Sequence, residues 1–126
     1  MKIRSDFVTN SSSSSYVIAK KSDCTKEDVI NSMCSLKNML DEVLEYCYIP
    51  DEELELKLKV QNKELAENAL KDYIADEILD EDYSMKLNDW SVVGGECSGD
   101  DGYILGKFLY EYGRTIDSEK IKIRTF

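Results

Sequence analysis

The sequence predicts an α+β fold in a single domain that spans residues 1–126. Residues 53–60 and 120–126 alternate between apolar and charged side chains, which is typical of strands with one face in water. Three other stretches repeat their apolar residues every three or four positions, as helices do. A fully parallel sheet needs continuously apolar strands. We therefore expect a mixed or mostly antiparallel sheet of about five strands, with three helices on one face, in the order ββαβαβαβ.

The first two predicted strands lie on either side of a run of serines. Residues 3–8 and 16–19 are rich in β-branched and aromatic side chains. The polar residues 9–15 between them lack glycine, which favours a longer loop over a two-residue turn. We expect this segment to form an ordered strand–loop–strand edge, with its apolar side chains largely buried in the sheet: Phe7, Val8, Tyr16 and Ile18.

The middle of the chain predicts two helices with a strand between them. Thr25 and Asp28 have the spacing of a capping box, and the apolar stripe that follows indicates one helix over 26–48, which Pro50 ends. Residues 53–60 are the strand with the clearest alternation. Asn62 can cap a second helix over 63–79. Because carboxylates oppose the dipole at a helix C-terminus, we expect this helix to end before the acidic run 80–82.

The last third predicts a strand, a loop, a helix and a strand. Residues 85–96 are predicted as one strand with an irregularity near Asn88 and Asp89, and the glycine-rich residues 94–102 as a loop. The helix over 101–112 would bury Ile104, Leu105, Phe108 and Leu109 and would end in a left-handed cap at Gly113. The strand 120–126 would point Ile121 and Ile123 inward.

Composition and charge exclude several functional classes. The 126 residues suit one folded domain, and the chain has no run of apolar residues long enough to span a membrane and no apolar run after Lys2 and Arg4 that would act as a secretory signal. Sixteen basic and 26 acidic residues give a formal net charge of −10, which disfavours direct binding of nucleic acid. We expect a cytoplasmic protein. Its acidic surface is suited to docking on a protein partner with a basic surface, and the alternative is that the charge serves solubility alone.

Catalytic chemistry is restricted by missing residue types. The chain has no histidine, which removes serine and cysteine catalysis with a histidine base as well as histidine zinc sites. Its four cysteines form no C-x-x-C pair and are expected to be free thiols. Cys97, the one candidate nucleophile, lacks a base and has carboxylate neighbours. No catalytic residue, metal ligand or cofactor is predicted.

The candidate binding residues fall in the two predicted loops. In the serine run, hydroxyls and backbone amides are suited to hydrogen bonding with a phosphate or a partner. The loop 94–102 lies where phosphate loops occur, but it lacks their lysine, and its carboxylates repel anions. They are suited to Mg²⁺ or Ca²⁺, although not at EF-hand spacing; the alternative is a surface turn in which an aspartate caps the next helix. The candidate residues are Asn10, Ser11, Ser12, Ser13, Ser14, Ser15, Glu96, Asp100 and Asp101.

Two acidic runs form a candidate docking patch. The runs consist of Asp51, Glu52 and Glu53, and of Asp80, Glu81 and Asp82. Runs of like charge at the ends of elements are usually solvated surface. If they share one side with Asp100 and Asp101, they form a negative surface spaced like phosphates, which suits the basic channel of a nucleic-acid enzyme. The aromatic residues Trp90, Tyr103, Tyr110 and Tyr112 are interpreted as core and edge packing.

The N-terminal string resembles a group of small proteins. The residues that carry the resemblance are MKIRSDFVTN at positions 1–10, the five serines that follow and the aromatic Tyr16, where the group commonly has phenylalanine. The string resembles the N-terminal signature of uncharacterised small proteins of Firmicutes and of their phages and mobile elements. The resemblance covers about the first eighteen residues. It implies a bacterial, plasmid or phage setting and transfers no functional residue.

Three functions are compatible with these observations. The first is a small acidic non-enzymatic binding protein, for which the resemblance suggests an inhibitor of a host defence nucleoprotein, as anti-CRISPR proteins are. The second is a nucleotide or phosphate binder, or a hydrolase that uses carboxylate-held Mg²⁺, with the serine run facing the loop 94–102. The third is a structural or regulatory subunit of a complex. The sequence does not indicate the oligomeric state.

Overall fold

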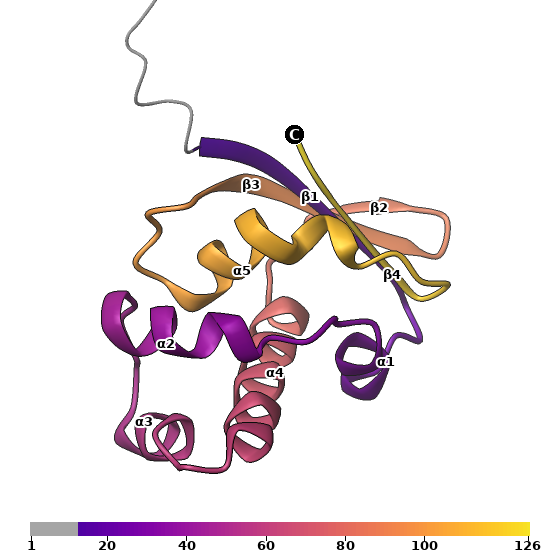
Figure 1. The fold of residues 1–126 in the computed structure, drawn as a ribbon. Helices are drawn as coiled ribbons and strands as arrows, with labels where there is room; N and C mark the ends of the chain where they lie inside the picture. Colours follow the sequence, from indigo (N-terminus) through magenta and orange to yellow (C-terminus); the bar gives the residue numbers. More distant parts are fainter. Residues whose placement is uncertain (1–12) are drawn as a thin grey trace, which may run out of the picture.

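The computed structural model describes residues 13–126, in which four strands form one antiparallel sheet. The strands are β1 (Ser13–Lys21), β2 (Met85–Leu87), β3 (Trp90–Ser98) and β4 (Ile121–Thr125), and their spatial order is β2-β3-β1-β4. β1 therefore lies inside the sheet, paired with β3 on one side and with β4 on the other. Figure 1 shows this sheet as the upper layer of the molecule.

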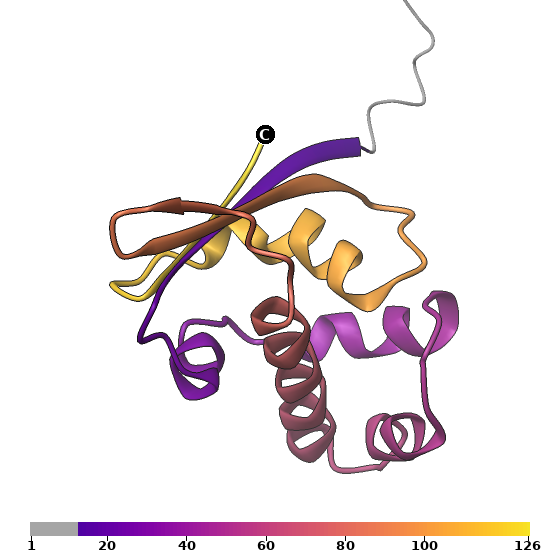
Figure 2. The same cartoon turned by 180° about the vertical axis from the view of Figure 1, so that it is seen from behind.

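All five α-helices lie on one side of the sheet. They are α1 (Lys26–Asn31), α2 (Lys37–Tyr46), α3 (Glu52–Leu58), α4 (Lys63–Leu79) and α5 (Ile104–Tyr112). Figures 1 and 2 show α5 directly against the sheet and α1–α4 beyond it, while the other face of the sheet carries no helix. The predicted α+β class is confirmed, and the sheet is antiparallel. The predicted five strands and three helices differ from the four strands and five α-helices of the described residues.

The core lies between the sheet and the helices. Ile18 of β1 and Ile121 and Ile123 of β4 are completely or almost completely buried, and they face the helices with Phe108 of α5. Alternate residues of these strands point to the other face, so the inward-facing set predicted for 120–126 is confirmed. Tyr16 is half-buried against the core. The strand predicted over 3–8, with Phe7 and Val8, lies outside the described residues.

Part of the serine run belongs to a strand, so the loop predicted over 9–15 is wrong for residues 13–15. Ser13, Ser14 and Ser15 pair with Ser98, Cys97 and Glu96 of β3. The carbonyl of Ser15 also accepts a hydrogen bond of 2.8 Å from the amide of Phe126. These partners are distant in sequence. They satisfy the backbone amides and carbonyls of a polar segment whose own residues favour a loop. Residues 9–12 lie outside the described residues.

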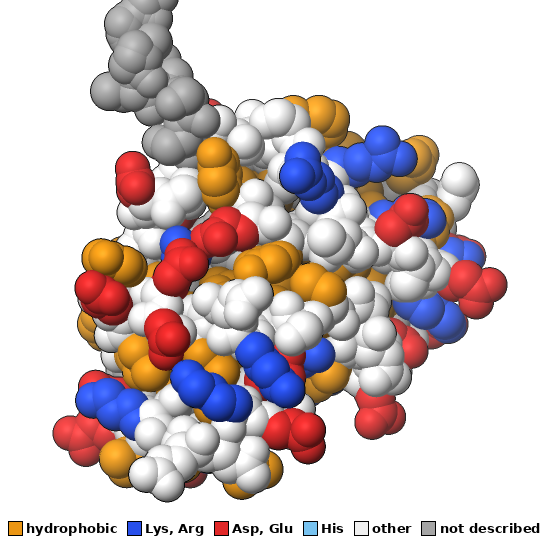
Figure 3. Space-filling view, in the orientation of Figure 1, with side chains coloured by type: hydrophobic (Ala, Val, Ile, Leu, Met, Phe, Trp, Pro, Cys, Tyr) orange, Lys and Arg blue, Asp and Glu red, His pale blue; other side chains and the backbone are white. Residues whose placement is uncertain are grey.

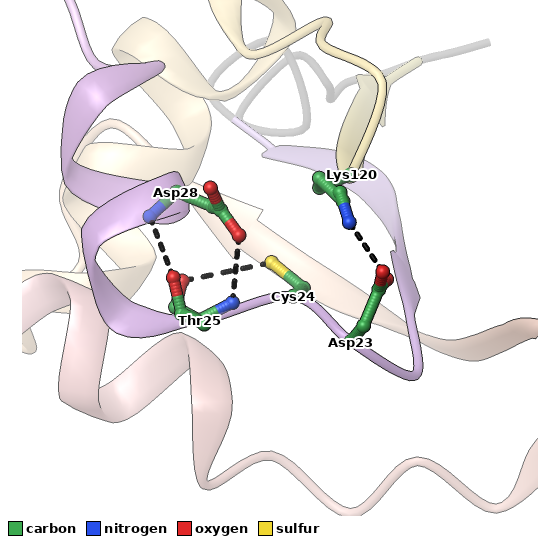
Figure 4. A network of polar contacts seen from close by, with 5 residues as sticks. All are labelled: Asp23, Cys24, Thr25, Asp28 and Lys120. Carbon is green, nitrogen blue, oxygen red and sulfur yellow. Dashed lines mark hydrogen bonds and ion pairs between the residues drawn. The ribbon is translucent and has the colours of Figure 1, made fainter.

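The predicted helix over 26–48 is two helices. The capping box is confirmed: the Thr25 amide donates to Asp28 Oδ2 (2.9 Å), and the Asp28 amide donates to Thr25 Oγ1 (3.2 Å), as Figure 4 shows. The same figure shows the ion pair of Asp23 with Lys120, which ties the start of this segment to the start of β4. α1 ends at Asn31 and α2 begins at Lys37.

The break between α1 and α2 is held by a buried carboxylate. Glu67 of α4 is 7% exposed, and its Oε2 accepts a hydrogen bond of 2.7 Å from the Leu36 amide. In a continuous helix that amide would bind the carbonyl four residues earlier. The charge-assisted bond replaces the helical one, so the chain turns between Ser32 and Leu36 and still buries Met33, Leu36 and Leu40.

The strand predicted over 53–60 is wrong, because this segment is the helix α3. Asp51 caps it by accepting a 2.7 Å hydrogen bond from the Leu54 amide. Leu54 and Leu58, four residues apart, are buried, whereas Leu56 is 69% exposed. Solvent-exposed ion pairs four residues apart join Glu53 to Lys57 and Glu55 to Lys59.

The single strand predicted over 85–96 is a hairpin. β2 and β3 are joined by the two residues Asn88 and Asp89, and Asn88 has a left-handed backbone (φ 57°) of the kind that two-residue hairpin turns require. β3 continues to Ser98, so the loop predicted over 94–102 is reduced to the residues between Ser98 and α5. Gly113 is not a left-handed cap: its φ is −53° and it begins a short 3₁₀ helix.

α4 agrees with its prediction in both position and cap. Asn62 Oδ1 accepts hydrogen bonds from the amides of Glu64 and Leu65, and the helix ends at Leu79, before the acidic run. The predicted inner face is correct for Ala66, Leu70, Ile74 and Ile78 and wrong for Leu65, which is 59% exposed. The exposed face of α4 is therefore free to contribute to a binding surface.

Candidate functional site

The serines and Glu96 meet, as the sequence suggested, but without the chemistry of an anion site. Ser13, Ser14, Ser15, Glu96 and Phe126 line one open depression of about 340 Å³. The strand register places Ser15 directly opposite Glu96, so a phosphate at the serines would meet a carboxylate. Asn10, Ser11 and Ser12 lie outside the described residues.

Asp100 and Asp101 lie at a different place, beside a buried lysine. They line a cavity of about 410 Å³ with Glu42, Tyr46, Gly99 and Lys107. The Lys107 amine forms ion pairs with Glu42 (2.9 Å) and Glu111 (2.8 Å) and donates to the Gly99 carbonyl (3.4 Å). These hydrogen bonds and charges raise the pKa of Lys107 despite its burial. The amine stays protonated at neutral pH, so it joins α2 to α5 and is not a base or a nucleophile.

The carboxylate of Asp101 organises the short loop before α5. Its Oδ1 accepts a 2.9 Å hydrogen bond from the Tyr103 amide. It does not cap the helix as expected for Asp100 or Asp101, since the N-cap residue is Tyr103 and no side chain makes a capping bond. A Cβ atom at Gly106 would overlap Asp101 Oδ2, so the glycine allows the carboxylate to lie against the first turn of α5.

Three of the four thiols lack the features of a nucleophile, while Cys34 is exposed. Cys97 is 3% exposed, and burial together with the charge of Asp101 raises its pKa. Burial likewise raises the pKa of Cys24 and of Cys47. Because the thiolate is the reactive form, a raised pKa disfavours a nucleophilic role for these three groups. Among residues 13–126 no group of three or more cysteine or carboxylate side chains could hold a metal ion.

The outer face of α4 gathers carboxylates from three parts of the chain. A groove of about 550 Å³ lies between α3 and α4, and its carboxylates are Asp51, Glu53, Asp72 and Asp76. An adjoining groove of about 490 Å³ contains Glu77 of α4 and Asp101. Tyr73 lines both grooves, which are therefore adjacent. Lys57 is the one cation among the residues that line them, and Lys26 of α1 pairs with Asp72 (2.8 Å) and Asp76 (3.0 Å) at the border.

Two exposed tyrosines extend this face. The Tyr48 amide donates a 2.7 Å hydrogen bond to the Gly102 carbonyl, which holds Tyr48 and Tyr103 next to each other in a short parallel bridge. Their residues are 64% and 69% exposed, so Tyr103 is not the packing residue that the sequence suggested. We call the whole face the acidic tyrosine surface, made of Asp51, Glu53, Asp72, Asp76, Glu77 and Asp101 with Tyr48, Tyr73 and Tyr103.

Tyr73 is positioned by this surface. Its hydroxyl is hydrogen-bonded to Glu77, and burial, followed by the charge of Glu77, raises its pKa. Asp72, Tyr73, Asp76 and Glu77 follow helical spacing on one side of α4. The sequence did not single out these residues. An amphipathic helix normally carries charged side chains on the side opposite its buried stripe, so carboxylates there are no signal of function.

The acidic runs predicted from the sequence are separated. Asp51 and Glu53 belong to the acidic tyrosine surface, and Glu52 is exposed in the same first turn of α3. The second run follows α4, where Asp80 is the C-cap residue, Glu81 Oε1 accepts a 3.4 Å hydrogen bond from Tyr16 Oη and Asp82 is exposed. Burial raises the pKa of Glu81. The second run is therefore partly used to support the sheet.

The comparisons with known proteins found no similarity that would assign a function. No family model matches the chain, and neither a curated protein nor a solved structure shows significant similarity to it. None of the described helices has the length and apolar character needed to cross a bilayer.

Proposed function

We propose that the protein is a small non-enzymatic binding protein that docks onto a basic protein surface through the acidic tyrosine surface. One observation carries the proposal: six carboxylates and three tyrosines line two adjacent grooves along α4, with Lys57 as the one lining cation. Such an excess of one charge attracts an oppositely charged partner and sets the orientation in which it arrives.

The tyrosines can supply the binding energy that exposed carboxylates do not provide. Exposed carboxylate pairs contribute little binding energy each, because water screens them. Tyrosine is enriched among the residues that dominate interface energies, since it buries a large rigid ring and keeps a polar tip. Tyr48 and Tyr103 are already held together by the backbone bridge, so docking does not have to order the segments that carry them.

The N-terminal resemblance motivates a narrower version of the proposal. A phage or mobile-element inhibitor of a host defence nucleoprotein would meet basic channels that normally hold nucleic acid. The acidic tyrosine surface has the charge to compete for such a channel. A structural or regulatory subunit would use the same surface on a permanent partner, and light scattering of the protein alone and with its partner separates a stable complex from a transient one.

The phosphate-binding alternative has less support. It requires the serine run and residues 94–102 to form one site. Ser13–Ser15 do pair with residues 96–98 of that stretch, but Asp100 and Asp101 line a different cavity. Both cavities contain carboxylates and neither contains an unpaired cation, since Lys107 is bonded to two glutamates. An anionic ligand would be repelled at either place.

The proposal is tested with a fluorescently labelled arginine-rich peptide and anisotropy titrations of the full chain. The informative variant is Glu53→Lys/Glu77→Lys, which reverses two charges inside the acidic tyrosine surface. We expect the affinity to fall about tenfold or more, the equivalent of about 1.4 kcal/mol, because two attractive contacts become repulsive. Binding of the unmodified protein should weaken with added salt.

The matched control is Asp89→Lys/Glu119→Lys, which changes the net charge equally at exposed positions outside the surface. We expect this variant to bind the peptide within about twofold of the unmodified protein. Equal losses in the two double variants would show that the peptide senses only the overall charge, and the proposed docking surface would then be wrong.

A further inference from the structure

The helix-free face of the sheet is chemically unlike the rest of the molecule. The side chains that point away from the helices include a continuous apolar set: Val17, Ala19, Met85, Leu87, Trp90 and Val92. Met85 and Leu87 are 63% and 65% exposed. In a two-layer fold this face is normally lined by polar side chains. The described residues place no element over it, as Figure 2 shows.

Cations border this apolar set on the side of β4. Lys122 and Arg124 point to the same face, where Ala19 pairs with Lys122 and Val17 pairs with Arg124. Lys21, opposite Trp90 on β3, holds its amine 5.5 Å from the centre of the indole ring. Figure 3 shows cations next to apolar side chains along the top of the molecule, where the sheet lies. In a chain of net charge −10, this concentration of positive charge is local.

Few carboxylates neutralise these cations. Lys122 is paired with Asp117 (2.7 Å), while Lys21 and Arg124 form no ion pair with the described residues. Glu96 is the one acidic residue that points to this face from β3, and it lies beyond the apolar set. The face thus has an apolar part on β2 and β3, a mixed centre on β1 and a basic border on β4.

We propose that this face, which we call the open sheet face (Val17, Ala19, Lys21, Met85, Leu87, Trp90, Val92, Lys122 and Arg124), binds an acidic amphipathic helix of a partner protein. A helix on the bare side would cover the sheet as α5 covers the other side. Its apolar stripe would lie on the β2–β3 part, and carboxylates along one edge of that stripe would meet Lys122 and Arg124. The proposal is independent of the acidic tyrosine surface, which lies on the helical side.

The geometry favours a protein over a nucleic acid on this face. Single-stranded nucleic acid is bound by stacking bases on exposed aromatic rings along a basic groove. Here the Lys21 amine lies over the Trp90 ring, and Trp90 is only partly exposed. Met85, Leu87 and Val92 offer aliphatic contact instead, which suits a helix that carries leucine or similar side chains.

Trp90 is the only tryptophan of the chain, so its fluorescence reports directly on this face. The experiment titrates the full chain with a synthetic acidic amphipathic helical peptide of leucine and glutamate. We expect a saturable shift of the Trp90 emission to shorter wavelength as the peptide excludes water from the ring. The same titration is run with anionic lipid vesicles and with a single-stranded oligonucleotide. A shift with either of these and not with the peptide would overturn the proposal.

Two pairs of matched variants locate the binding. Met85→Ser/Leu87→Ser removes exposed apolar side chains from the open sheet face, and Lys122→Glu/Arg124→Glu reverses its basic border; each should weaken peptide binding about tenfold or more. The controls Leu56→Ser/Leu65→Ser and Lys59→Glu/Lys63→Glu make the same changes at exposed positions on the helical side and should stay within about twofold. Equal losses in variants and controls, or an emission spectrum that the peptide leaves unchanged, would contradict the assignment.

Discussion

Single residues stabilise this fold at points where the helix or strand propensity of the neighbouring residues does not predict the structure, and Glu67 is the clearest case. Its carboxylate is buried, accepts the hydrogen bond from the Leu36 amide and lies 3.8 Å from the amine of Lys71. Burial alone would raise its pKa, but the bonds from Leu36 and Ser35 and the charge of Lys71 outweigh burial and lower it. A carboxyl group whose pKa is lowered by folding stabilises the folded state in its ionised form.

We predict that Glu67→Gln destabilises the protein at pH 7 by about 1–3 kcal/mol, because a charge-assisted hydrogen bond to a buried amide is weakened. The stabilisation by Glu67 is present above the unfolded pKa of about 4.3 and is lost as the pH falls through the lower folded value. Urea unfolding at pH 7, 5 and 3 should therefore show the difference between variant and parent shrinking towards the acid end.

Glu64→Gln on the same helix is the control for that measurement, since Glu64 is exposed and its substitution should stay within about 0.5 kcal/mol at each pH. If the difference in unfolding free energy between Glu67→Gln and the parent protein stays constant down to pH 3, the prediction is wrong. Glu67 would then stabilise the fold through side-chain packing and not through its ionised hydrogen bond.

At the scale of elements, the alternation of residues 53–60 is compatible with two structures. Leu54, Leu56, Leu58 and Val60 would share one face of a strand, but in α3 only the leucines four residues apart are buried together. The Asp51 cap, glutamates in the first turn and the Glu–Lys pairs four residues apart all favour the helix. Because α3 has only seven residues, its apolar pattern does not distinguish the two-residue period of a strand from the 3.6-residue period of a helix.

We predict that Leu54→Ala and Leu56→Ala differ sharply in stability. Leu54 is 7% exposed in the core, so its truncation should cost about 2–5 kcal/mol, whereas Leu56 is 69% exposed and its truncation should cost less than about 0.5 kcal/mol. Chemical denaturation of the two variants measures the difference. Equal costs would support the strand, in which both side chains point inward.

The elements that could be predicted from the sequence are those determined by neighbouring residues. The capping box, Asn62 with α4, the buried Ile104, Phe108 and Leu109 of α5 and the inward pair of β4 are set by neighbouring residues, and they were predicted correctly; Leu105, also predicted as buried, is only partly so. The break before Leu36 depends on Glu67, 31 positions away, and the strand character of Ser13–Ser15 depends on pairing with β3. Such partners leave no signal in the local pattern.

The candidate site was predicted only in part for the same reason. The acidic run at Asp51 and the loop at Asp101 were recognised, but their meeting at α4 is a property of the tertiary structure. Tyr48 and Tyr103 become a pair through a backbone bridge between segments more than fifty residues apart. An outward row of carboxylates on a helix carries no distinctive sequence signal.

The whole molecule presents two faces of opposite chemistry. The acidic tyrosine surface lies on the helical side and the open sheet face on the other side of the sheet. A basic partner and an acidic partner could therefore bind at the same time without competing for the same residues. Charge variants on one face should leave binding at the other face nearly unchanged, since salt screens charges beyond about 10 Å at 0.1 M.

We propose α4 and its neighbours as the docking surface for a basic partner. Backbone amide chemical shifts of the full chain, measured by NMR during a titration with the arginine-rich peptide, test it most directly. We expect the largest changes at residues 48–53, 68–77 and 101–103, with the amides of β4 nearly unmoved. Changes spread evenly over all acidic segments, or concentrated outside these three stretches, would contradict it.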